Sequence, residues 1–149
     1  MKKIFVFCVT LLSLNILAQS SSDEILRRAE IMPVFQQCDD DAFTNAPYPC
    51  TMKMLSDYIK SSVVLEDLSG KITKCSINLV VEKDGTVSNV ELVRGVKVNI
   101  ENEQEKISLE NLINNKIINV VEGINFVLPG YQNGEKVRVM LRFSATVNY

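Results

Sequence analysis

The chain contains no histidine, and this absence excludes several kinds of site. Cysteine–histidine and serine–histidine nucleophilic pairs cannot form, nor can metal centres that use imidazole ligands. No glycine-rich loop of the kind that holds phosphate groups is present either. The sequence also lacks internal repeats, low-complexity tracts and a proline-rich linker. We therefore expect a single domain that is not an enzyme and binds no cofactor.

The residues that could carry chemistry lack the partners that such chemistry needs. Asp39 to Asp41 offer carboxylate oxygens, but the central glycine and terminal glutamate of a calcium-binding loop are missing. Cys75 lies in an alternating pattern, where a lone cysteine is usually a small buried apolar residue. Glu82 and Asp84 flank a predicted turn and do not form a catalytic pair. We expect a solvated aspartate loop and no metal site.

Residues 1–19 have the pattern of a secretory signal peptide. Lys2 and Lys3 provide a positive start, Ile4 to Leu14 an apolar run, and Leu17 to Ser20 a small-residue cleavage region. The apolar run is shorter than the roughly 20 residues that a membrane-spanning helix needs. We expect export followed by cleavage. Without cleavage, the segment would anchor the chain in the inner membrane.

Charge gives no reason to expect a polyanionic partner. Without Lys2 and Lys3, the exported chain has 14 basic and 18 acidic residues, so its net charge is about −4. A negative net charge disfavours binding to nucleic acid and to anionic membrane surfaces. We therefore expect neither as a partner.

Three cysteines remain after the signal segment, and an exported protein meets an oxidising compartment in which disulfides persist. Cys38 and Cys50 flank a polar loop that contains proline, whereas Cys75 lies in an alternating strand pattern. We predict a Cys38–Cys50 disulfide and a free Cys75. Closing a loop of this length contributes about 3 kcal/mol by the chain-entropy estimate.

The clearest periodic pattern lies between Pro129 and Tyr149. Apolar residues occupy alternate positions there, and only Met140 breaks the alternation. Because strand side chains alternate between two faces, this pattern predicts a long strand with one buried and one exposed face. The apolar positions are Val137, Val139, Leu141, Phe143, Ala145, Val147 and Tyr149.

A second alternating pattern, from Ile72 to Val81, predicts another strand. Lys83 to Thr86 contain the Asp-Gly signal of a tight hairpin. The return strand begins at Val87 and stops at Arg94-Gly95. The parity of its apolar residues shifts near Ser88 and Asn89, which predicts a β-bulge there.

Two amphipathic patterns predict helices. Thr51 caps the first helix, and the second runs from near Ser108 to Gly123. A weaker helical pattern spans Asp23 to Ile31. The apolar stripe of the first helix is Met52, Leu55, Ile59 and Val63, and that of the second is Leu109, Leu112, Ile113, Ile117, Val120, Val121 and Ile124.

These elements predict an α+β domain of two layers, in which a three-stranded antiparallel sheet is packed by two helices. The order of the elements is helix, strand, strand, helix, strand. We place an N-terminal lead-in at residues 20–50 and the domain at residues 51–149.

Several ordered motifs resemble the TonB C-terminal domain family. They are VVEKDGTVSNVELVRG (Val80 to Gly95), an amphipathic helix, LPGYQNGEKVRV (Leu128 to Val139) and a terminal strand. The upstream MPVFQQC (Met32 to Cys38) and Cys50 resemble the lead-in of single-domain members. The resemblance covers roughly Met32 to Tyr149.

The resemblance implies a small antiparallel sheet packed by two helices, in the periplasm of a Gram-negative bacterium. It implies an energy-transducer-like role in transmembrane transport, in which the domain binds a segment of an outer-membrane receptor or another envelope protein. Such binding is β-strand addition along the last strand. The edge residues it implies are Arg138, Val139, Met140, Leu141, Arg142, Phe143, Ser144, Ala145 and Thr146.

Two functional hypotheses remain open from the sequence. The first is an exported module that binds an envelope protein by strand addition. The second is a secreted structural protein that uses the same edge to form a homodimer. A third possibility is that the last strand is internal to the sheet, or that Arg138 and Arg142 only protect its edge from aggregation.

Overall fold

The computed structural model describes residues 24–36, 38, 47–63 and 71–149. Its elements follow the order β1, α1, β2, β3, α2, β4, β5. The predicted signal peptide at residues 1–19 and the loop of Asp39 to Asp41 lie outside these ranges. None of the helices in the described ranges is both long and apolar enough to span a bilayer.

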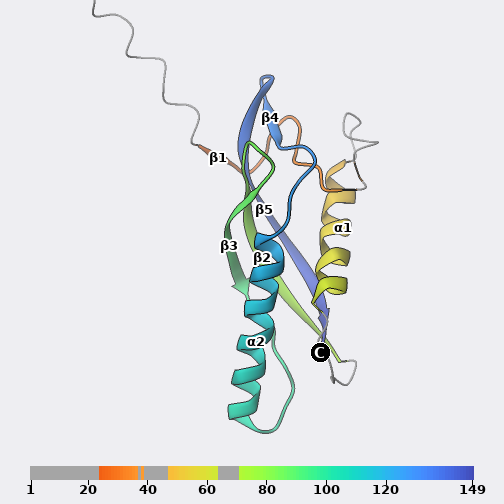
Figure 1. The fold of residues 1–149 in the computed structure, drawn as a ribbon, viewed down its shortest axis with the longest axis vertical. Coiled ribbons are helices and arrows are strands. Elements are labelled where there is room, and N and C mark those ends of the chain that lie inside the picture. The colour runs from red at the N-terminus through yellow and green to blue at the C-terminus, as the bar shows by residue number, and fades with distance from the viewer. Residues whose placement is uncertain (1–23, 37, 39–46, 64–70) are drawn as a thin grey trace, which may run out of the picture.

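Two long strands form the centre of the sheet. β2 (Ile72–Val81) and β5 (Glu135–Asn148) pair antiparallel in one unbroken register, from Ile72 opposite Asn148 to Val81 opposite Val139. β3 (Val87–Arg94) pairs antiparallel with the other side of β2. These are the three predicted strands, and Figure 1 shows β2 beside β5, which extends beyond β2 toward β4.

The prediction of a purely antiparallel three-stranded sheet is wrong, because two short strands also pair with β5. β1 (Ile25–Leu26) lies parallel to Arg138–Val139, and β4 (Gly130–Gln132) lies antiparallel to Glu135–Val137. The result is a mixed five-stranded sheet. Strands of two or three residues are too short to produce a periodic pattern, so their pairing depends on tertiary contacts.

The predicted hairpin and bulge are confirmed. Gly85 has a φ of +87° in the turn between β2 and β3, which glycine adopts without a steric penalty. Asn78 pairs with Glu91 and Val80 with Ser88, so β3 has one extra residue there. Asn89 lies inside this bulge with a φ of +49°.

Helix α1 (Pro47–Ser62) begins before the predicted cap, so the assignment of Thr51 as N-cap is wrong. Proline is well suited to the first turn of a helix, because the N–H that it lacks would have no partner there. Thr51 is fully buried instead. Its hydroxyl accepts a hydrogen bond from Phe35 N at 3.2 Å and lies 3.5 Å from Pro33 O as a donor.

Helix α2 (Glu103–Glu122) also begins earlier than predicted, with Asn102 as its N-cap. The Asn102 side chain accepts hydrogen bonds from the backbone N–H groups of Gln104 and Glu105, which fixes the start of the helix. Gly123 is its C-cap, as predicted. Of the predicted stripe, Leu112 is 57% exposed.

Glu110 is a buried charged residue of α2. Its carboxylate accepts hydrogen bonds from Lys97 Nζ at 3.0 Å and from Val98 N at 3.1 Å. These two donors hold the pKa of Glu110 below its ordinary value. The carboxylate therefore ties the loop after β3 to α2.

The lead-in joins the same sheet and core. The weak prediction of a helix in this stretch is wrong, because residues 25–26 form β1 and Ile31 bridges to Tyr131. The predicted disulfide is confirmed: Cys38 and Cys50 are joined, and Cys75 is free and buried. Phe35 is 4% exposed and packs edge-on against Tyr58 and Phe126.

One main core lies between the buried face of the sheet and the two helices. α1 packs on β5 and α2 on β3, as Figure 1 shows. Alternate residues of β2 and β5 face this core, as their periodicity predicts. The sheet residues are Cys75, Ile77, Leu79, Val81, Val139, Leu141, Phe143, Ala145 and Val147, and the helical ones are Leu55, Ile59, Ile113, Ile117 and Val121.

Candidate edge-strand binding site

The hydrogen-bonding direction of each β5 residue follows from its pairing with β2. Tyr149 N donates to Lys71 O at 2.8 Å, and Lys71 N donates to Tyr149 O at 3.0 Å. In an antiparallel pair such exchanges recur at every second residue. The unbroken register therefore directs the backbone groups of odd-numbered β5 residues at β2. Those of even-numbered residues point away from it.

The outward edge of β5 is covered only in its first part. β1 pairs with it at Arg138 and Val139, and β4 pairs with β5 before that point, at Glu135–Val137. Beyond Val139, no strand in the described ranges pairs with that edge. The residues with outward N–H and C=O groups along this open stretch are Met140, Arg142, Ser144, Thr146 and Asn148.

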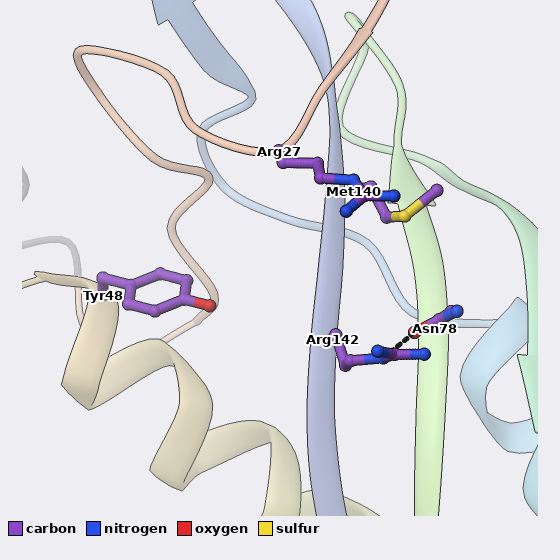
Figure 2. Close-up of a pocket in the computed structure, with 5 residues that line it drawn as sticks. All are labelled: Arg27, Tyr48, Asn78, Met140 and Arg142. Carbon is purple, nitrogen blue, oxygen red and sulfur yellow. Dashed lines mark hydrogen bonds between the residues drawn. The ribbon is translucent and has the colours of Figure 1, made fainter. Parts of the chain in front are cut away.

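A pocket of about 190 Å³ adjoins the start of this open edge (Figure 2). Three sheet residues line it, Asn78 on β2 and both Met140 and Arg142 on β5. Arg27, which follows β1, and Tyr48, in the first turn of α1, complete the lining. The pocket therefore lies where the lead-in, α1 and the exposed face of the sheet meet.

Tyr48 is held in place by the start of α1. The disulfide joins α1 to Cys38, and the buried Thr51 hydroxyl binds the lead-in backbone at Phe35. Tyr48 is 37% exposed, and Figure 2 shows its hydroxyl directed toward β5. A phenol in this position can donate a hydrogen bond to a group that enters the pocket.

The two outward arginines of β5 have different partners. Arg138 forms a two-pronged ion pair with Glu82, with Nε at 2.7 Å and Nη2 at 2.8 Å from the carboxylate oxygens. The Ser88 hydroxyl also donates to Glu82. Mainly because of the Arg138 hydrogen bonds, the pKa of Glu82 lies below its ordinary value. The charge of Arg138 is thus matched locally.

Arg142 has a neutral partner. Its Nε donates to Asn78 Oδ1 at 2.9 Å, the contact drawn in Figure 2, and Asn78 Nδ2 donates to Glu91 at 3.4 Å. Neither Arg142 nor Arg27 forms an ion pair with an acidic residue of the described ranges. The pocket is therefore lined by two arginines that form no ion pair within the described ranges, and the acidic residue next to them, Glu91, contacts Asn78 and not Arg142.

The free edge of β3 is less suited to accept a strand. Its pairing with β2 contains two register shifts, and Asn89 has a positive φ. A bulge bends a strand and interrupts its regular row of donors and acceptors, which protects an edge from pairing. The open edge of β5 belongs to a strand with no such interruption.

The residues that the sequence proposed for the edge fall into two groups. Val139, Leu141, Phe143 and Ala145 bury their side chains in the core and direct their backbone groups at β2. The other five have outward backbone groups. Arg138 among them is paired with β1, so Met140, Arg142, Ser144 and Thr146 belong to the open stretch.

Three residues of the pocket were not proposed from the sequence. Arg27, Tyr48 and Asn78 lie far apart along the chain, and none stands in a motif. Only the polar position of Asn78 in an alternating strand indicated that it faces the exposed side of the sheet.

The free thiol and the acidic residues define no second site in the described ranges. Burial raises the pKa of the Cys75 thiol, whose Sγ lies 3.7 Å from Ala145 O. No group of three or more aspartate, glutamate, cysteine or histidine residues in the described parts of the chain is arranged to hold a metal ion.

Comparison of the chain with family models, with curated proteins and with solved structures finds no match.

Proposed function

We propose that this protein is an exported interaction module that binds an extended segment of another protein by strand addition to the open edge of β5. The partner strand would lie along Met140 to Asn148. The observation that carries the proposal is the row of outward N–H and C=O groups, which continues along one edge from the point where β1 leaves it. An unpaired row of this kind is a template for another strand.

The class of partner is proposed from the sequence motifs. Because these motifs resemble the TonB C-terminal domain, we take the partner to be a segment of an outer-membrane receptor or another envelope protein, met in the periplasm. A contribution to TonB-dependent transport is part of the proposal. Nothing in it requires a catalytic group.

A proline placed at an outward position tests the edge directly. Ser144→Pro removes an N–H that points away from β2, whereas Ser144→Ala keeps that N–H and removes the exposed side chain. Prolines are tolerated at edge positions whose N–H has no partner in the sheet. Both variants should therefore fold, and circular dichroism checks this.

The measurement is capture from envelope extracts, identified by mass spectrometry. We expect the unaltered protein and Ser144→Ala to capture the same proteins and Ser144→Pro to lose them. Equal capture by a folded Ser144→Pro contradicts strand addition. If Ser144→Pro does not fold, Thr146→Pro with Thr146→Ala as its control repeats the comparison at the next outward position.

Sedimentation equilibrium separates this proposal from homodimer formation. A monomer over the micromolar range is expected. A dimer that dissociates on Ser144→Pro would favour a second copy as the occupant of the edge.

A further inference from the structure

The pocket beside the open edge gives the partner strand a chemical signature. We propose that it binds the carboxylate of an aspartate or glutamate carried by the added strand, through Arg27 and Arg142. This inference rests on the proposed strand addition and specifies one residue of the ligand.

Three of the five residues that line the pocket present hydrogen-bond donors. Arg27 and Arg142 supply guanidinium N–H groups, and Tyr48 supplies a phenolic hydroxyl. The side-chain oxygen of Asn78 is already occupied by Arg142, and its amide group is bonded to Glu91. A ligand group that only accepts hydrogen bonds and carries negative charge fits this set, and guanidinium matches carboxylate in a planar, two-pronged geometry.

Because the pocket adjoins the open edge of β5, a strand added to that edge would place one of its side chains in the pocket. Leu26 of β1 pairs with Val139, and Arg27 follows it where the chain leaves the edge. Met140 and Arg142 both line the pocket and present outward backbone groups. A strand bonded to that backbone would therefore bring a side chain to the two arginines. Exposed ion pairs are weak alone, so the backbone bonds must supply most of the affinity.

Charge also argues against a second copy of this chain as the occupant. From Lys136 to Tyr149 the chain contains Lys136, Arg138 and Arg142 and no acidic residue. A second copy that pairs with the edge through its residues 136–149 would bring only basic and neutral side chains to the two arginines. The occupant is therefore an acidic segment of a different protein.

A random-peptide library displayed on phage tests this specificity. It is selected on four proteins: the unaltered chain, Ser144→Pro, Arg27→Gln/Arg142→Gln and Lys53→Gln/Lys136→Gln. The last variant removes two positive charges outside the pocket, so it controls for net charge. Enriched peptides are then synthesised with their acidic residue and with the matching amide.

We expect enrichment of peptides that carry aspartate or glutamate at one fixed position, on the unaltered chain and on the lysine control. Replacing that acid by its amide should weaken binding about three- to tenfold, because exposed ion pairs are individually weak and two arginines contribute. The acidic peptide should bind the Arg27→Gln/Arg142→Gln variant more weakly than the unaltered chain by the same factor. Raising the salt concentration should reduce the difference in affinity between the acidic peptide and its amide.

The outcomes separate the two proposals. If the enriched peptides carry no acidic residue but still bind Ser144→Pro more weakly than the unaltered chain, the carboxylate pocket is wrong and strand addition is supported. Acidic peptides that bind the arginine variant as tightly as the unaltered chain also overturn the pocket. Peptides that bind Ser144→Pro undiminished, or no enrichment at all, count against strand addition and therefore against both.

Discussion

At the scale of single residues, the contrast between Arg138 and Arg142 decides where the molecule carries unmatched charge. Both point to the exposed face of β5, and they are separated by one outward residue. Arg138 is paired with Glu82, and both side chains are about a quarter exposed, at 23% and 24%. Arg142 reaches only an amide oxygen. The first arginine therefore stabilises the hairpin, and the second remains available to a ligand.

The Glu82–Arg138 pair predicts a dependence of stability on pH. Because folding lowers the pKa of Glu82, its contribution is complete above the ordinary glutamate pKa of about 4.3. It is lost as pH falls through the lower pKa of the folded state. We expect Glu82→Gln to reduce the free energy of unfolding by about 1–2 kcal/mol at pH 7 and by much less near pH 3.

Urea denaturation at the two pH values measures this difference. Glu91→Gln is the control, because Glu91 is exposed and has only a 3.4 Å contact with Asn78. A loss for Glu82→Gln that is equal at both pH values would show that the carboxylate charge contributes nothing.

At the scale of elements, β3 and the open part of β5 form two different kinds of sheet edge. β3 has bulges and a residue with positive φ, whereas the register of β5 with β2 has no shift. Helix α1 packs against the buried side of β5. Regular spacing of outward backbone groups is what an added strand requires.

The alternation of hydrogen-bonding direction in β5 predicts opposite results for two neighbouring prolines. Ser144→Pro removes an outward N–H and should cost at most about 1 kcal/mol. Ala145→Pro removes a bond to β2 opposite Cys75 and should cost about 3 kcal/mol or more, a large part of the stability of a small domain. Thermal and urea denaturation measure both, and similar losses would mean that the assigned directions are wrong.

At the scale of the whole molecule, the candidate site depends on the joining of three distant parts of the chain. Residues of the lead-in, of α1 and of the central strands line one pocket. The covalent link between the first two is the Cys38–Cys50 disulfide, which spans 12 residues of sequence. Phe35 adds a second link, since it is buried against Tyr58 and Phe126.

The disulfide should stabilise the fold by about 3 kcal/mol, the estimate for closing a loop of this length. We expect Cys38→Ala/Cys50→Ala to lower the free energy of unfolding by that amount. Denaturation with and without a reducing agent supplies the control. The reductant should bring the unaltered protein to the level of the double variant and leave the variant unchanged. A reductant effect of equal size on both would assign the loss to something other than this bond.

The long elements were predictable because their patterns are local. Alternating apolar residues define β2 and β5, the Asp-Gly pair defines the hairpin, and the parity shift at Ser88 and Asn89 defines the bulge. The helices were predictable in position but not in their starts, since the apolar stripes that predicted them begin only at Met52 and Leu109, after Pro47 and Asn102. The disulfide was predictable because Cys38 and Cys50 flank one polar loop, whereas Cys75 lies in an alternating strand pattern.

The sequence by itself determined the two faces of β5, because burial every second residue follows from a strand's period of two. Only the tertiary structure decided which edge of that strand is open, since this depends on β2 taking one side and on β1 ending at Leu26. It also decided that Arg27, Tyr48 and Arg142 share a pocket. No local pattern encodes such a meeting, because the three residues approach one another only through packing of the lead-in and α1 around the sheet.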